Sequence, residues 1–191
     1  MITPEKLLES AKELETQLRT WRRTLHRHPE VGFDLPETKA LVKKALTEMG
    51  YAPQDCGRCG VLALAGGKRP GKTILMDGHI DTVDVIDAPQ WEHDPFGGEI
   101  ADGKIYGRGA SDMKGSDCAM ITAAARFAEK PGRDFAGRVC VSCTVHEERF
   151  EGVSSREITR LAKPDLVIIG EATSTTVKRG QRGRAEVVVE T

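Results

Sequence analysis

Apolar residues recur at helical spacing near the start of the chain. One stripe, with members three or four positions apart, consists of Leu7, Ala11, Leu14, Leu18, Trp21 and Leu25. This spacing predicts one amphipathic helix over residues 4–26, which ends before Pro29. A second helix is predicted over residues 36–49, because Pro36 suits a first turn and Gly50 suits a left-handed C-terminal cap.

Further along, short apolar runs alternate with amphipathic segments. Strands are predicted at residues 51–55, 61–65, 72–77, 138–145 and 166–169. Helices are predicted over residues 115–130 and from a capping box at Ser154–Glu157 to Pro164, and a hairpin over residues 99–106 turns at Asp102-Gly103. Several strands are apolar on both faces. This order predicts an α/β fold of three layers, in which helices cover both faces of a mostly parallel sheet.

Charge and composition exclude several classes of protein. The 28 Lys and Arg residues nearly balance the 29 Asp and Glu residues, so no surface for nucleic acid is expected. The start, MITPEKLLES, lacks the apolar core of a signal peptide, and no apolar run approaches the ~20 residues of a membrane helix. We therefore expect a cytoplasmic protein that does not bind membranes.

Two C-x-x-C pairs, Cys56/Cys59 and Cys140/Cys143, invite a zinc-site interpretation. The pairs are far apart in the chain, and the second lies in a strand pattern that directs its two thiols to opposite faces. Buried or half-buried free thiols are the favoured interpretation, with a structural zinc site as the alternative.

Residues 66–73, GGKRPGKT, match the phosphate-binding pattern G-x-x-x-x-G-K-[ST]. That loop requires a helix N-terminus directly after it, but the next residues, ILMDGH, form a strand pattern. Pro70 also removes one backbone amide from the loop. We interpret the segment as a basic hairpin turn and keep nucleotide binding as a weak alternative.

Side chains that can bind metal follow three of the predicted strands, at the sheet edge where ligands bind in such folds. His79 and Asp81 share one face of an extended segment, so the carboxylate can orient a metal-binding imidazole. The full set of candidates is His79, Asp81, Asp112, Glu147, Glu148 and Glu171. Ordinary loop acids explain each residue alone, but their convergence favours a metal site.

Four motifs carry a resemblance to a known family: HIDTV at 79–83, WEHDPFGGEIADGKIYGRGASDMKGS at 91–116, HEE at 146–148 and GEATS at 170–174. In this order they resemble the dinuclear zinc peptidases and deacylases, which include acetylornithine deacetylase, succinyl-diaminopimelate desuccinylase, aminoacylase and glutamate carboxypeptidases. The resemblance implies a zinc-exopeptidase-like catalytic domain. It also implies hydrolysis of an amide bond, in an N-acyl amino acid or a small peptide, by a metal-activated water.

The resemblance assigns ligands to two zinc ions, with cobalt or manganese as alternative metals. His79 and Glu171 are implied to bind one ion and Glu148 the other, while Asp112 bridges them.

The same resemblance implies two further roles and one backbone feature. Glu147 is implied to be the general base, and Asp81 is implied to be the partner that orients His79. The bond between Asp112 and Met113 is implied to be cis.

The resemblance also implies a division of the chain. Residues 1–178 would form the N-terminal part of the catalytic domain, and residues 179–191 would begin a lid domain through which the full-length protein forms a homodimer. In this family further histidines follow, from the lid and from a C-terminal segment. We therefore expect an incomplete enzyme that is inactive alone. The alternatives are a non-catalytic remnant that binds metal or a partner, and one half of a split enzyme.

Overall fold

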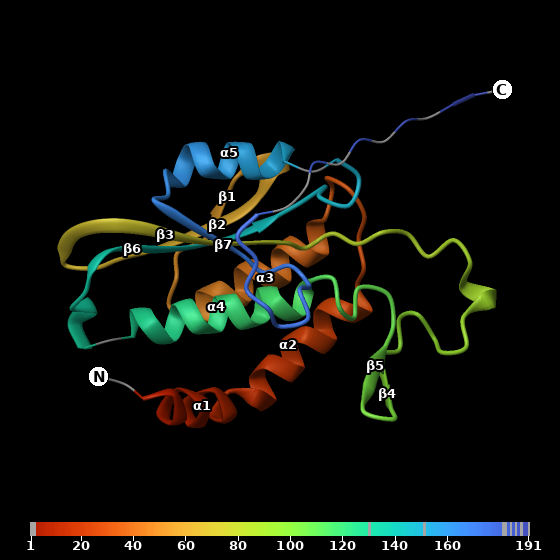
Figure 1. Cartoon of the computed structure of the whole chain (residues 1–191), viewed down its shortest axis with the longest axis horizontal. Coiled ribbons are helices and arrows are strands. Elements are labelled where there is room, and N and C mark those ends of the chain that lie inside the picture. Colours follow the sequence, from red (N-terminus) through yellow and green to blue (C-terminus); the bar gives the residue numbers. More distant parts are fainter. Residues whose placement is uncertain are drawn as a thin grey trace.

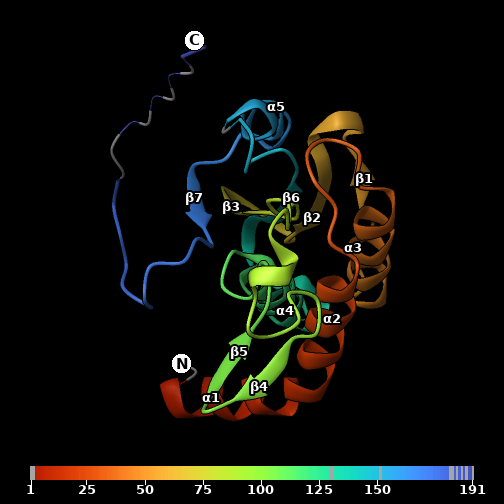
Figure 2. The same cartoon turned by 90° about the vertical axis from the view of Figure 1, so that its right-hand side faces the viewer.

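The computed structural model describes residues 3–129, 131–150, 152–180, 183, 185, 187, 189 and 190. Its main feature is a five-stranded sheet (Figure 1), and the strand order is β1-β2-β6-β3-β7 (Figure 2). The strands are β1 (Gln54–Asp55), β2 (Gly60–Gly66), β3 (Arg69–His79), β6 (Ala136–Thr144) and β7 (Leu166–Ile169). β3 pairs in parallel with both β6 and β7, whereas β2 pairs antiparallel with β1 and β6. The sheet is therefore mixed, and its parallel part contains β6, β3 and β7.

Helices cover both faces of the sheet, which confirms the predicted three-layer α/β class. Three helices lie on one face: α2 (Glu15–Arg27), α3 (Pro36–Glu48) and α4 (Lys114–Ala128). On the other face lies α5 (Val153–Ala162), as the view along the strands in Figure 2 also shows. Short 3-10 turns occur at η1 (Gly57–Cys59), η2 (Ala88–Gln90) and η3 (Pro131–Arg133).

The alternation of side chains along β6 divides the core into two clusters. Val139, Val141 and Cys143 join the larger cluster, under α2, α3 and α4. Cys140 instead joins Leu62, Leu75, Ile158 and Ala162 in the smaller cluster under α5. The two thiols of this C-x-x-C pair therefore point to opposite faces, as predicted, and all five cysteines are free.

The connection between β2 and β3 is not the hairpin that the sequence suggested. β6 lies between these two strands, and the linking residues cross its start, where Gly67 N–H donates to the Gly137 carbonyl at 2.9 Å. A hairpin requires neighbouring strands. The hairpin prediction was therefore wrong, because β6 separates β2 from β3. The pattern at 66–73 leads directly into β3, and no helix N-terminus follows it to bind phosphate.

The predicted N-terminal helix is divided into α1 (Pro4–Glu13) and α2 at Leu14. The Leu14 N–H bonds to the Ala11 carbonyl, three residues back, so the regular α-helical ladder is interrupted there. α1 buries no residue, whereas α2 buries His26 and also Leu25, which joins the core. Only α2 is held by packing, which explains why the two segments differ in direction (Figure 1).

The capping box at Ser154–Glu157 was also wrong. α5 begins at Val153, after Gly152 in a left-handed conformation, so Ser154 lies inside the helix. Its buried hydroxyl donates to the Val145 carbonyl at 2.6 Å and ties α5 to the end of β6.

The small hairpin was predicted correctly. Strands β4 (Glu99–Ala101) and β5 (Lys104–Tyr106) pair around Asp102-Gly103, both at positive φ. Two other expectations concern the remaining chain. Six of the thirteen residues of the proposed second unit, 179–191, lie outside the described residues, so this unit and its final strand stay predictions. In the part of the chain that is described, no helix has the length and apolar composition that crossing a bilayer requires.

Candidate metal centre

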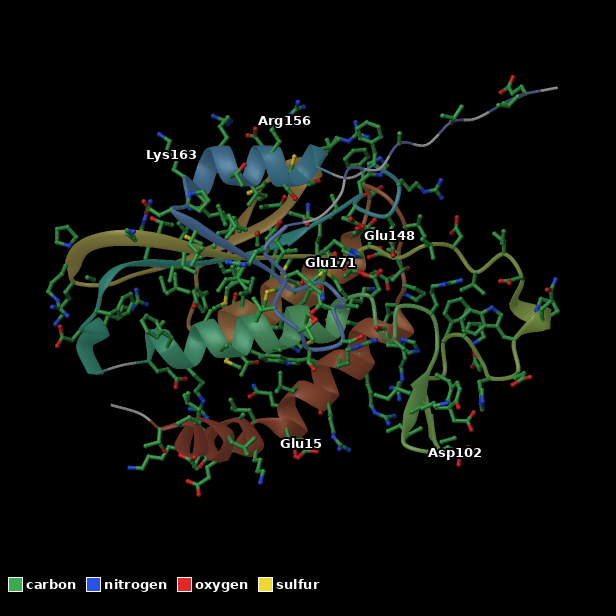
Figure 3. All side chains as sticks on the ribbon, in the orientation of Figure 1. Glu15, Asp102, Glu148, Arg156, Lys163 and Glu171 are labelled. Carbon is green, nitrogen blue, oxygen red and sulfur yellow. The ribbon has the colours of Figure 1, made fainter. Side chains whose placement is uncertain are left out.

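Three parallel strands place the candidate ligands at one edge of the sheet. His79 ends β3 and pairs with Thr144, which ends β6 just before residues 146–148. Asp77 pairs with Ile169, which ends β7 just before Gly170-Glu171. Figure 3 shows Glu148 and Glu171 at this same end of the molecule. The sheet register therefore brings together side chains that are far apart in the sequence.

His79 lies at the centre of this group and is 1% exposed. Its Nε2 atom is 2.8 Å from Asp112 Oδ1, 3.6 Å from Glu171 Oε1 and 3.7 Å from Glu147 Oε2. Asp112 reaches this position from the loop before α4, where the Asp112–Met113 peptide bond is cis, as the resemblance implied. Met113 is buried, and its Sδ accepts a hydrogen bond from the His79 N–H at 3.3 Å.

The donor atoms fit a divalent cation. Among the described residues, two sets of three can offer atoms within 4.8 Å of one another: His79 with Asp112 and Glu148, and His79 with Glu147 and Glu171. One imidazole with carboxylates is a donor set that zinc and manganese accept. No cysteine belongs to either set, which leaves the C-x-x-C pairs outside any candidate metal site.

The two sets divide the acids differently from the assignment that the resemblance implied. That assignment gave Glu171 to one ion and Glu148 to the other, with Asp112 bridging and Glu147 as the base. In the structure Glu171 shares its set with Glu147, and Asp112 shares its set with Glu148. His79 and the four acids of the two sets are brought together, but their individual roles stay predictions.

The charges around His79 hold a proton on its ring. Burial lowers the pKa of His79, but its contacts with Asp112 and Asp81 outweigh burial and raise that pKa to about 11. The contact with His79 lowers the pKa of Asp112. Burial, followed by the nearby Asp112 charge, raises the pKa of Glu148. Without a cation, the acidic cluster is therefore compensated by a protonated imidazole.

We expect metal binding to release this proton. Because His79 is protonated below its pKa of about 11, a cation must displace the proton, and apparent zinc affinity should fall about tenfold per pH unit between about pH 8 and 6. Calorimetric zinc titrations in two buffers of different ionisation enthalpy would count the released protons. An affinity that does not change with pH would contradict the protonated state.

Asp81 has a second role that the sequence did not reveal. Its main-chain carbonyl is 3.1 Å from His79 Nδ1, whereas its carboxylate lies 3.5 Å away. The carboxylate accepts hydrogen bonds from Glu147 N–H at 3.2 Å and from Glu148 N–H at 3.3 Å. The buried Asp81 therefore connects the end of β3 to the loop that carries both glutamates.

We expect Asp81→Asn to keep the fold and to weaken zinc affinity roughly 10- to 100-fold, because an amide is a poorer acceptor for two N–H groups and for the imidazole. A zinc titration with a chelating indicator would measure the loss. Asp84→Asn is a matched control, since Asp84 is an exposed acid of the same loop that pairs with Arg149. Equal zinc affinities in the two variants would show that Asp81 contributes no more to metal binding than an exposed acid of the same loop.

Several buried or half-buried charged residues around the centre were missed. Arg22 donates to the Gly109 carbonyl at 2.6 Å and holds the loop before Asp112. Lys114 donates to the Leu25 carbonyl, and burial lowers its pKa to about 8. Asp77 accepts from Ser142 and Ser155. An acid inside the apolar run ILMDG was the one available signal, because charged residues rarely occupy buried strands.

Comparisons with known proteins agree with this arrangement. The sequence profile of peptidase family M20/M25/M40 matches residues 75–184, more than half of the chain. Succinyl-diaminopimelate desuccinylase 2 of Ruegeria sp. (strain TM1040) is 36% identical over 172 residues, which are 83% of this chain and 42% of that protein.

Two solved structures share the fold. Human carnosine dipeptidase 1 aligns with a TM-score of 0.66 and 21% identity, over 86% of this chain and 40% of that one. The YXEP protein of Bacillus subtilis, described as a dinuclear metal-binding peptidase, aligns with a TM-score of 0.52 and 25% identity, over 69% of this chain and 35% of that one. This chain spans less than half the length of these relatives. The profile match, which contains every candidate ligand, shows that the chain belongs to peptidase family M20/M25/M40.

Proposed function

We propose that this chain is the metal-binding part of a hydrolase that cleaves an amide bond in an N-acyl amino acid or a small peptide. The observation that carries the proposal is the convergence of one buried imidazole and four carboxylates at the ends of β3, β6 and β7 and at the start of α4. The membership of a peptidase family and the likeness to a desuccinylase support amide hydrolysis as the reaction.

In this proposal His79, Asp112, Glu148 and Glu171 are ligands of two divalent cations in the whole protein, with zinc favoured over cobalt and manganese, and this chain alone holds about one of them tightly. Bound cations would lower the pKa of a water molecule and polarise the scissile carbonyl. Glu147 takes a proton from the attacking water and delivers it to the leaving amine as the C–N bond breaks. The products are a carboxylate and an amine. Asp81 keeps Glu147 and Glu148 in place through their backbone amides.

Three further parts of the proposal concern the whole protein. We propose that residues 1–178 belong to the catalytic domain and that residues 179–191 lead into a lid through which two copies associate. The substrate is proposed to be a small molecule rather than nucleic acid or a membrane. The five free cysteines support a reducing compartment, and we place the protein in the cytoplasm.

The test combines metal analysis with a panel of substrates. The 191-residue chain and the longest reading frame that contains it would be purified, loaded with zinc, and assayed with N-acetyl amino acids, succinyl-diaminopimelate and dipeptides. We expect both proteins to bind zinc and the longer one to release an amine. Metal binding without hydrolysis in the longer protein would indicate a non-catalytic metal-binding remnant. A failure of both proteins to bind metal would overturn the proposal.

A further inference from the structure

His146 directly precedes the two glutamates of the centre and adopts an unusual backbone conformation. Its φ is +65°, in the left-handed region where histidine, asparagine and aspartate are the more common non-glycine residues. Its carbonyl accepts a hydrogen bond from the Phe150 N–H at 3.0 Å, so residues 146–150 form a tight turn. The direction of Glu147 and Glu148 therefore depends on how His146 is held.

The His146 ring is held by stacking. It lies on Phe33 with ring centroids 3.7 Å apart and an interplanar angle of 18°. The Arg58 guanidinium carbon is 4.7 Å from the Phe33 centroid. Since the imidazole occupies one face of Phe33, the guanidinium must lie against the other. Phe33 is thus fixed from both sides.

Among the described residues, none forms a hydrogen bond with Nδ1 that would help to hold the ring of His146, and this atom is buried. Gly32, at φ +79°, runs close beside the ring, and a Cβ there would lie 3.5 Å from Nδ1. The ring is therefore positioned by packing against residues 32–33 rather than by a bond through Nδ1.

We propose that the Phe33–His146 stack is a positioning device that sets the direction of Glu147 and Glu148 toward His79. The 146–150 turn is held at two places. The Asp81 carboxylate accepts hydrogen bonds from the N–H groups of Glu147 and Glu148, and Phe33 stacks on the ring of His146. Phe33 belongs to the segment between α2 and α3, and the main-chain carbonyl of Glu30 in that segment accepts a hydrogen bond from Thr82 N–H at 3.1 Å. The α2–α3 segment thereby contacts both loops of the centre.

The inference rests on the proposed metal-dependent function, and its test uses cobalt as a probe with a visible spectrum. His146→Phe keeps a stacking ring and removes both nitrogens. His146→Asn keeps a residue suited to positive φ and removes the ring. Phe33→Leu removes the stack from the other side. His93→Asn is the matched control, because His93 stacks on Tyr106 at 3.8 Å beside the β4–β5 hairpin and belongs to neither ligand set.

Cobalt affinity and the visible cobalt spectrum would be measured for each purified chain, with thermal unfolding recorded in parallel. We expect His146→Asn and Phe33→Leu each to weaken cobalt binding about tenfold and to change the spectrum. The double variant should bind no more weakly than either single variant, because the two residues act through one contact. His146→Phe and His93→Asn should stay within about twofold of the wild-type affinity.

The outcomes separate the inference from the function on which it rests. Equal losses in His146→Phe and His146→Asn would show that a stacking ring at position 146 does not preserve the metal centre, and would overturn the positioning role. Unchanged affinity in both His146→Asn and Phe33→Leu would also overturn it, and the second variant decides the case if the first does not fold. If the wild-type chain binds no cobalt, the proposed function fails and this inference fails with it.

Discussion

Replacing His79 by alanine is expected to remove tight metal binding from this chain. His79 is the only member common to both ligand sets, and it is the only imidazole in either. Its loss would leave carboxylates alone, which are weaker ligands for zinc than a set that includes an imidazole. Elemental analysis should show a fall from about one zinc per chain to almost none, and competition titration should show a loss of at least about 100-fold.

We expect about one zinc ion per wild-type chain, because the two ligand sets share His79. One imidazole nitrogen binds one cation, so the two sets in the described part of the chain cannot both be complete. His28→Ala is a suitable control, because His28 is a half-exposed histidine that pairs with Glu37 at 3.1 Å and belongs to neither set. Two tightly bound zinc ions per wild-type chain would contradict this account.

Glu147→Gln is expected to lower turnover about 10²- to 10⁴-fold in the longer, active protein while zinc content stays unchanged. Glutamine keeps the shape of the side chain but cannot accept the proton of the attacking water. Steady-state assays and elemental analysis on the same preparation would test both parts. Glu148→Gln is the matched comparison, since Glu148 is proposed as a ligand and its loss should remove zinc.

The geometry makes this a demanding test. Glu147 Oε2 lies 3.7 Å from His79 Nε2, and Glu147 belongs to one of the two ligand sets. If zinc content falls together with activity in Glu147→Gln but not in Glu148→Gln, the roles of the two glutamates must be exchanged.

The parts of the centre that follow strand ends could be predicted from the sequence. His79 and the glutamates after β6 and β7 occur at the ends of apolar runs, and parallel strands bring such ends together. Local periodicity and the rule for parallel sheets are sufficient for this prediction. It therefore located the residues of the centre without fixing their distances.

What could not be predicted depends on contacts between distant segments. β6 inserts between β2 and β3 from more than fifty residues further along the chain, and no local pattern in 60–79 signals that insertion. Ser154 reads as a helix cap, but its hydroxyl bonds to Val145. The two N–H groups that donate to Asp81 are positioned by the 146–150 turn, and the contact between His146 and Phe33 supports that turn.

The reactivity of the cysteine thiols can report on unfolding of the chain. Cys118, Cys140 and Cys143 are buried in the core, and burial raises the pKa of Cys118 to about 12. The half-buried Cys56 and Cys59 lie outside that group. Since alkylating reagents attack exposed thiolates, the two outer thiols should react in the native chain and the three inner ones only after it opens. Counting added mass with time would then follow unfolding without a spectroscopic label, and would show whether bound zinc slows it.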